Sequence, residues 1–174
     1  MFTLSYKISI GTRKFSGVFE VAIKRSITSL GATCVIKVPT TAALKQTDGS
    51  RLNVLTAQQI KRGDPVEVEL GYDGKNYKEF SGFVSRVNYT HPLEIECEDA
   101  LFLLRQMSIA KSYNEKDKAT LEKVLADITE GTGIKVDTGG LKINISKLIL
   151  ATKSGAEVSR EIALNDIISR YGLV

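Results

Sequence analysis

The strongest constraint on what this chain can fold into is an alternation of apolar and polar residues in its first hundred positions. From Phe2 to Ile10, an apolar side chain occupies every second position. Successive side chains of a β-strand point to opposite faces of a sheet, so this spacing predicts a strand with one buried face. The same pattern predicts strands over residues 15–23 and 32–38, and Pro39 ends the latter because proline lacks the N–H that a ladder needs.

Residues 63–98 predict a three-stranded antiparallel meander. Its strands are the alternating segments 66–70, 77–87 and 93–97. Asp73 and Gly74 join the first two strands, because an Asp-Gly pair accepts the positive φ of a tight hairpin at little cost. A turn over residues 89–92 joins the last two. With the three strands before it, the meander predicts a tube-type antiparallel β-barrel over residues 1–99.

Other residues of this half mark turns and breaks in the pattern. Gly63, Asp64 and Pro65 predict the turn that starts the meander. Gly82 lies inside a predicted strand, where an isolated glycine indicates a bulge or the close approach of another backbone. Residues 40–62 lose the alternation and are largely polar, so they predict a long loop of the kind that often carries contacts.

After residue 99 the spacing of apolar residues changes from two to three and four, which is typical of helices. Asp99 predicts the N-cap of a short helix over residues 100–107, and Thr120 predicts the cap of a second helix. The apolar stripe of that second helix comprises Leu121, Val124, Leu125 and Ile128, and Gly131 and Gly133 follow it. Short strands are expected over residues 134–136 and 141–145.

A third helix is expected to begin after Ser159 and to end at Gly172, because serine is a favoured N-cap and glycine a favoured C-terminal residue. Its inward-facing residues are Leu164, Ile167, Ile168 and Tyr171. The expected fold is therefore α+β and mainly β, with the barrel followed by a smaller α/β segment over residues 100–174.

Composition narrows the function classes. Twenty-four Lys and Arg against twenty Asp and Glu give a formal charge of +4, spread along the chain, which permits nucleic-acid binding without requiring it. No window approaches the ~20 apolar residues of a membrane span, so no membrane anchor is expected. Cys34 and Cys97 lie in predicted strands and are expected to be buried small hydrophobes in a reduced, unexported chain.

Few residues are candidates for chemistry. The only histidine, His91, stands in a turn, so no catalytic triad or two-histidine metal site can form. The acidic residues Glu94, Glu96 and Glu98 share one strand face, and they are expected to form a solvated face that pairs with basic neighbours. The sequence therefore predicts no catalytic residue, no cofactor and no metal.

Three stretches of this chain, in this order, carry a resemblance to a known family. They are residues 63–72 (GDPVEVELGY), residues 80–84 (FSGFV), and residues 95–99 (IECED) with Leu103 and Leu104 after them. In this order they resemble phage baseplate-hub proteins, the late-control family, whose relatives include the hub portion of type VI secretion spike proteins. The helix with Tyr171 and Gly172 resembles the family's step before a further barrel. The structural motif is thus Gly63, Asp64, Pro65, Gly71, Gly74, Gly82, Asp99, Tyr171 and Gly172.

The resemblance implies a structural, non-enzymatic role in a phage or prophage tail that is assembled in the bacterial host cytoplasm. It implies a hub domain over residues 1–99 and a homotrimer around a central channel, with the tail tube and the spike as partners and nucleic acid only as passing cargo. The family's second barrel is missing here, so the chain is expected to be the front part of a hub. The apolar Leu173 and Val174 would open that barrel, and the isolated chain is expected to be a monomer or weak dimer.

Two other functions stay open from the residues alone. A small-barrel nucleic-acid or glycan binder would use the aromatic and basic residues of the segment 72–86. A cell-wall hydrolase would use Glu94, Glu96 or Asp99, although no second carboxylate is placed to form a pair with them. For the hub, the segment 40–62 and the meander are the expected contact regions.

Overall fold

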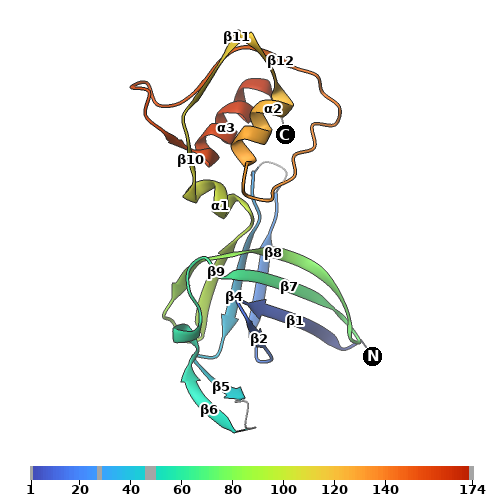
Figure 1. The fold of residues 1–174 in the computed structure, drawn as a ribbon. Coiled ribbons are helices and arrows are strands. Elements are labelled where there is room, and N and C mark those ends of the chain that lie inside the picture. Colours follow the sequence, from blue (N-terminus) through green and yellow to red (C-terminus); the bar gives the residue numbers. More distant parts are fainter. Residues whose placement is uncertain (1, 27–28, 46–49, 173–174) are drawn as a thin grey trace. The chain divides into compact units, whose positions relative to one another are not determined.

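The computed structural model describes residues 2–26, 29–45 and 50–172. The chain divides into two compact units, Met1–Asp99 and Ala100–Val174, which are described separately. The first is a large antiparallel sheet, and the second combines helices with short strands, so the α+β, mainly β class is confirmed (Figure 1). Leu173 and Val174 lie outside the described residues.

A seven-stranded antiparallel sheet forms the first unit (Figure 1). Its strands, in spatial order, are β2 (Arg13–Phe15), β1 (Leu4–Ile10), β7 (Pro65–Tyr72), β8 (Lys75–Asn88), β9 (Leu93–Glu98), β4 (Thr33–Val38) and β3 (Glu20–Lys24). The meander β7–β8–β9 is present as predicted, with the turn over residues 89–92 between its last two strands.

The predicted barrel closure is wrong, because the sheet is open among the described residues. The predicted strand over residues 15–23 is in fact two strands, β2 and β3, at opposite ends of the strand order. The pairing with β1 ends at Phe15. The chain then pairs with β4, where the Phe19 N–H donates to the Lys37 carbonyl at 2.8 Å. The segment 15–23 cannot pair with β1 and with β4 along its whole length. No ladder of hydrogen bonds therefore joins β1 to β3 in the described residues.

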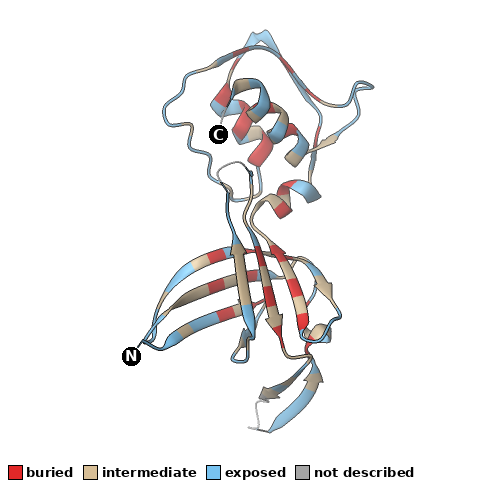
Figure 2. Ribbon diagram, turned by 180° about the vertical axis from the view of Figure 1, so that it is seen from behind, coloured by how far each residue is buried: buried red, intermediate tan, exposed pale blue. Residues whose placement is uncertain are grey.

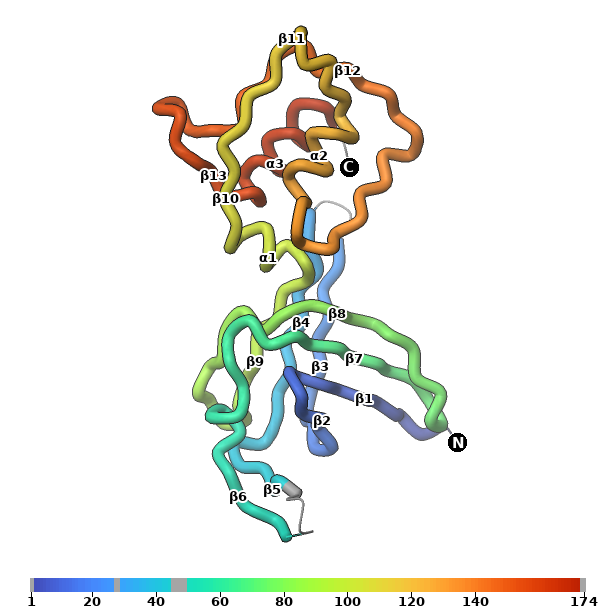
Figure 3. The backbone as a smooth tube through the Cα atoms, in the orientation of Figure 1, coloured from blue at the N-terminus to red at the C-terminus, as the bar shows by residue number. Residues whose placement is uncertain are grey.

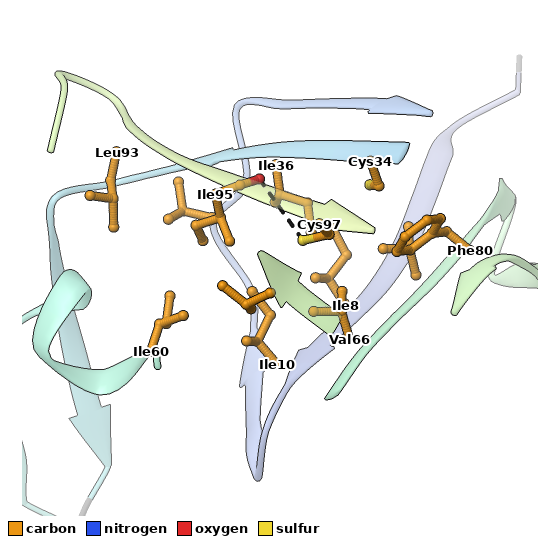
Figure 4. Packing of buried hydrophobic residues seen from close by; sticks show 13 residues of the cluster. Ile8, Ile10, Cys34, Ile36, Ile60, Val66, Phe80, Leu93, Ile95 and Cys97 are labelled. Carbon is orange, nitrogen blue, oxygen red and sulfur yellow. Dashed lines mark hydrogen bonds between the residues drawn. The ribbon is translucent and has the colours of Figure 1, made fainter. Parts of the chain in front are cut away.

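The core of the first unit lies on the inner face of this sheet (Figure 4). Ile8, Ile36 and Ile95 are at most 2 % exposed and point toward one another from β1, β4 and β9. Cys34 and Cys97 are buried free thiols, as predicted, and they occupy directly opposed positions of β4 and β9. Burial raises the pKa of the Cys34 thiol to about 12 and raises that of Cys97 as well, so both act as small apolar residues.

The predicted long loop over residues 40–62 is also wrong in part. It contains a β-hairpin of β5 (Thr41–Lys45) and β6 (Arg51–Leu55), followed by a short 3-10 helix over Thr56–Gln59. Apolar Ala42 opposite Val54 and Leu44 opposite Leu52 provide the alternation that the polar composition masked. The hairpin projects beyond the end of the main sheet (Figure 3).

In the described part of the second unit, residues 100–172, the chain forms three helices and two small sheets. Its elements are α1 (Leu101–Gln106), β10 (Ser108–Ile109), β11 (Lys111–Thr120), α2 (Leu121–Thr129), β12 (Asn144–Leu150), β13 (Val158–Ser159) and α3 (Arg160–Tyr171). A separate core gathers Leu121, Val124 and Ile128 of α2 with Ala163 and Ile167 of α3. None of the residues that the structure describes belongs to both cores.

The helix caps of this unit follow the predictions in two of three cases. The Thr120 and Ser159 hydroxyls accept the N–H groups of Lys123 and Ile162, each at 3.3 Å. By contrast, Asp99 is not the cap of α1, because α1 begins after Ala100 without a side-chain cap. The Asp99 carboxylate instead accepts the Ala32 N–H at 2.7 Å, which ties β9 to the segment before β4.

The strands of the second unit were predicted poorly. Residues 134–136 form no strand, and the strand expected over residues 141–145 is β12, which runs from Asn144 to Leu150. Its partner β11 was not predicted, because only Tyr113 and Ala119 of its ten residues are buried. Tyr113 donates to Asp127 at 2.7 Å, and so anchors β11 to α2.

Candidate assembly surface

The inner face of the sheet continues past its own core. On β1, inner-face residues Ile8 and Ile10 are 2 % and 1 % exposed, whereas Tyr6 and Leu4 on the same face are 38 % and 76 % exposed. Figure 2 shows exposed residues gathered where β1 approaches the N-terminus and buried residues farther along the strands. The apolar face is therefore covered at one end only.

Neighbouring strands extend this uncovered face. Leu70 of β7 lies opposite Tyr6 on one side and Tyr77 of β8 on the other, and Tyr72 lies opposite Leu4. Tyr72 and Tyr77 are 56 % and 69 % exposed. A contiguous apolar surface of this kind marks a contact site more often than isolated exposed residues do.

The uncovered residues line a groove of about 1280 Å³ whose other wall is formed by Phe19, Val21 and Ile23. The groove is larger than the roughly 300–1,000 Å³ that is usual for small-molecule sites. Its floor continues the hydrophobic core, and an edge-to-face contact of Phe2 with Tyr72, 6.2 Å between ring centroids, stands at its mouth. This shape and lining suit a protein segment. We refer to the lining as the open inner face; its exposed large apolar residues are Phe2, Leu4, Tyr6, Phe19, Tyr72 and Tyr77.

Polar groups around the groove are engaged with one another. Arg25 and Glu79 form an ion pair at 3.6 Å, the Asp73 carboxylate accepts the Thr3 N–H at 2.9 Å, and the Ser5 hydroxyl donates to Asn76 at 2.5 Å. These contacts support the walls of the groove.

The predicted motif residues at the meander have structural positions that explain their identity. Gly63 has a φ of +88°, and its N–H donates to the Val84 carbonyl at 2.8 Å. Asp64 accepts the Lys61 N–H at 2.8 Å, and the Pro65 carbonyl accepts the Gly11 N–H at 2.8 Å. These bonds fix the turn that starts β7.

Gly71, Gly74 and Gly82 shape the strands beside the groove. A Cβ atom at Gly71 would stand 1.9 Å from the Lys75 carbonyl oxygen, and one at Gly82 would stand 2.1 Å from that of Glu98. Gly82 is therefore a close backbone approach, as predicted, and Gly74 has a φ of +80° after Asp73 at +52°. In the other unit, the Gly172 N–H caps α3 after Tyr171 by donating to Ile168.

Of the predicted acidic face, Glu94, Glu96 and Glu98 are all half-buried, and Glu96 pairs with a basic neighbour. Glu96 of β9 accepts two hydrogen bonds from the Arg86 guanidinium at 2.8 and 3.1 Å, and Asn88 donates to both Glu94 and Glu96. Bonds from Arg86 and Asn88 lower the pKa of Glu96. Glu94 and Glu96 thus share the Asn88 amide, whereas the Asp99 carboxylate accepts the Ala32 N–H.

Removing the Arg86 guanidinium is expected to lower the stability of the sheet more at neutral than at acidic pH. The pKa of Glu96 is lower in the folded chain than its ordinary value of 4.5. The ion pair with Arg86 therefore stabilises the fold above pH 4.5, and this stabilisation is lost as the pH falls through the lowered pKa. The effect is small because Arg86 is largely exposed. Urea unfolding of Arg86→Gln and the unchanged chain at about pH 7 and about pH 3 measures it. An equal difference at both pH values would contradict this electrostatic origin.

The aromatic and basic residues of the segment 72–86 do not all lie on one surface, although Tyr72, Lys75 and Tyr77 line the same groove. Phe80 is buried in the core, whereas Tyr77 lines the groove. Lys78 pairs with Glu67, and Arg86 pairs with Glu96. The charges of Lys78 and Arg86 are thus partly neutralised by neighbouring carboxylates.

Other candidate chemistry is absent from the part of the chain that the structure describes. His91 is an exposed turn residue, as predicted. Within residues 2–26, 29–45 and 50–172, no three His, Cys, Asp or Glu side chains gather to hold a metal ion. None of the described helices has the length and apolar character needed to cross a membrane.

Sequence reasoning identified the meander but missed the β1 and β3 walls of the open inner face. Phe2, Leu4 and Tyr6 were assigned to a buried face, because their spacing is the same as that of Ile8 and Ile10. The available signal was a change of residue type along one face, from aromatic residues at the start of β1 to isoleucine at its end. Tyrosine is common at contact surfaces, since its ring is apolar and its hydroxyl is polar.

Comparisons with known proteins bear on the fold. No protein-family model matches the sequence, and no curated protein matches it. The crystal structure of the 43 kDa tail protein of prophage MuSo2 from Shewanella oneidensis is similar over 98 % of this chain, with a TM-score of 0.63 and 17 % identity. The tail protein from Neisseria meningitidis MC58 is similar over 97 %, with a TM-score of 0.58 and 13 % identity.

The chain spans about half the length of both proteins, 49 % of the first and 46 % of the second. The similarity covers nearly all of this chain, and so includes both the open sheet and the helical unit. At identities of 17 % and 13 %, what is shared is the fold. This chain therefore has the fold found in about half of each of two tail proteins.

Proposed function

We propose that this chain is a structural component of a phage tail and acts by assembly instead of catalysis. The observation that carries the proposal is the open inner face, an apolar surface continuous with the core that the described residues leave uncovered. An assembly subunit needs such a surface, because burying it on a partner supplies the free energy of association. The fold shared with two tail proteins supports the choice of a tail over other assemblies.

In its finer form, the proposal makes the chain part of the baseplate hub between the tail tube and the spike. Residues 1–99 would be the hub domain, and residues 100–174 would be an α/β segment that follows it in the sequence. The resemblance of residues 63–72, 80–84 and 95–99 to hub proteins supports this position. Its partners would then be tube and spike proteins and further copies in a trimer, with nucleic acid only passing through.

The proposal is tested by replacing two exposed tyrosines of the open inner face, Tyr72→Ser with Tyr77→Ser. In a phage or prophage that carries this gene, the doubly changed protein is expected to lower the yield of intact tails by about tenfold or more, since single interface anchors are worth about 2 kcal/mol or more. Both side chains are more than half exposed, so the isolated protein should keep its fold. Tail counts by electron microscopy and infectivity measure the effect.

The matched control is Tyr89→Ser. Tyr89 is 80 % exposed and lies between β8 and β9, away from the groove lining. Its replacement is expected to leave tail yield unchanged, and a labelled chain should be found at the baseplate end of the tail. Normal yield from the Tyr72 and Tyr77 variant, or a label absent from tails, would refute the assembly role.

A nucleic-acid or glycan binder remains the weaker proposal. Phe80 is in the core, and the cations Lys78 and Arg86 pair with glutamates. A hydrolase is weaker still, because Glu96 and Asp99 are engaged in separate structural bonds.

A further inference from the structure

Two strand edges without a neighbouring strand flank the groove. β1 pairs with β7 along its whole length but with β2 only over Ile8–Ile10, so residues 4–7 have one side without a strand partner among the described residues. β3 pairs with β4 alone, and its outer side is likewise without a strand partner in the described ranges. Exposed edges of this kind present backbone N–H and C=O groups that can pair with another strand.

The outer face of the sheet carries charges of alternating sign near each of its two edges. On one side, Glu69 of β7 lies opposite Lys7 of β1, at 3.4 Å. On the other side, Glu20 of β3 lies opposite Lys37 of β4, at 2.7 Å, and Glu94 of β9 follows Lys37. The β1 edge therefore carries a cation, Lys7, and the β3 edge carries an anion, Glu20.

An antiparallel alignment that joins these two ends also matches the inner face. Placing Lys7 opposite Glu20 puts Tyr6 opposite Val21 and Leu4 opposite Ile23. All four of these apolar residues line the same groove. A slip by one residue would place charged residues opposite apolar ones, because side chains alternate between faces. Charge and polarity thus select one register.

A single chain does not make this pairing. The segment that follows β2 turns away from β1 to reach β4, and the groove separates the two edges. Paired strands stand about 4.8 Å apart, which leaves no room for a groove between them. Each edge is therefore left able to pair with a strand from another molecule.

We propose that this molecule is a second copy of the chain, whose β3 edge pairs antiparallel with residues 4–7 of β1 in the first copy. The partner strand would extend the sheet and lay Val21 and Ile23 beside the open inner face. Each copy has one free-standing β1 edge and one β3 edge, so the contact is head-to-tail. Successive copies form a ring if the rotation that relates one copy to the next closes on itself. The inference deepens the proposed assembly role by naming self-association through strand pairing as its basis.

The register is tested by disulfide trapping between two singly changed chains, Lys7→Cys and Glu20→Cys. Directly opposed residues of antiparallel strands have Cα atoms about 4.5–5.5 Å apart, within the range that a disulfide spans. Mixing the two chains under mild oxidation is expected to give a covalent heterodimer on a non-reducing gel. The native thiols Cys34 and Cys97 are buried and should not compete.

The off-register control mixes Lys7→Cys with Ala22→Cys. In the proposed alignment, position 22 lies on the outer face two residues from the position opposite Lys7. This mixture should therefore give at least about fivefold less heterodimer than the matched one. A chain carrying both Lys7→Cys and Glu20→Cys should give dimers and larger covalent species. If that chain formed only an intramolecular disulfide, the sheet would close on itself and the inference would be wrong. It would also be wrong if the matched and off-register mixtures gave equal yields.

These outcomes are separable from those of the proposed function. Loss of tails with the Tyr72 and Tyr77 variant, together with no trapping at Lys7 and Glu20, would keep the tail role and refute strand pairing between copies. A specific disulfide between Lys7→Cys and Glu20→Cys, together with normal tails from the Tyr72 and Tyr77 variant, would support the strand pairing. It would refute the tail role of the open inner face.

Discussion

Replacing Gly82 by alanine is expected to unfold the sheet of the first unit or to lower its free energy of unfolding by more than about 3 kcal/mol. The added Cβ would stand 2.1 Å from the Glu98 carbonyl oxygen and 2.9 Å from the Asp99 Cα. Both contacts are with backbone, which cannot rotate away as a side chain can. β8 and β9 would have to separate where the core is most buried, at Val84 and Cys97.

Gly17→Ala is the matched control for this prediction. A Cβ at Gly17 meets only the Pro39 Cγ at 3.7 Å, an ordinary van der Waals contact. Its stability is therefore expected to change by no more than about 0.5 kcal/mol. Urea unfolding followed by circular dichroism measures both variants, and similar stabilities for the two would show that the strands can shift to accept the methyl group.

The second large effect is expected in the helical unit, for Ile128→Ala. Ile128 of α2 is fully buried in a core shared with α3, β11 and β12. Removing its larger side chain leaves a cavity among neighbours that can only partly collapse, which costs about 2–5 kcal/mol. Because none of the described residues belongs to both cores, the amide signals of residues 1–99 should keep their native positions.

Lys123→Ala on the same helix provides the comparison. Lys123 is exposed, and its backbone N–H keeps the bond to the Thr120 hydroxyl whatever the side chain. Its replacement should alter stability by a few tenths of a kcal/mol, since alanine is a good helix former. Thermal unfolding monitored by NMR separates the two units, and simultaneous loss of both sets of signals in Ile128→Ala would contradict independent cores.

Local chemistry made much of this fold predictable from the sequence. Alternation identified β1, β4 and the meander, because each strand has one face on the core. The turn at Asp73 and Gly74 and the caps at Thr120, Ser159 and Gly172 follow from side-chain and backbone preferences that act within a few residues. Such interactions are readable without knowing what the segment packs against.

The sequence-based predictions were wrong where pairing between residues far apart in the sequence determines the structure. Residues 15–23 alternate as one strand, yet they divide because β1 and β4 compete for them. Asp99 has a favourable residue type for a cap, but the Ala32 N–H, 67 residues away in sequence, takes its carboxylate. The mostly exposed β11 forms because β12 offers a ladder and not because its own residues alternate.

The candidate site was predictable in part for the same reason. The alternation of apolar residues predicts that Leu4, Tyr6 and Ile8 lie on one face of β1. It does not predict at which residue that face stops being buried. The position of that limit depends on how far the strands diverge, which no short window of sequence records. The turn residues at one wall were identified, whereas the opposite wall required the three-dimensional arrangement.

The open inner face also ties the lifetime of each subunit to how many partners surround it. A partner that binds only the folded chain stabilises it by mass action, in proportion to the logarithm of the partner's concentration. Under the proposed assembly, an incorporated copy is held folded by its neighbours, whereas a surplus copy leaves its apolar stripe in water and opens more often. Proteases act on the opened form, so they would remove surplus subunits in preference to incorporated ones. The surface that builds the complex would thereby also set the ratio of its components.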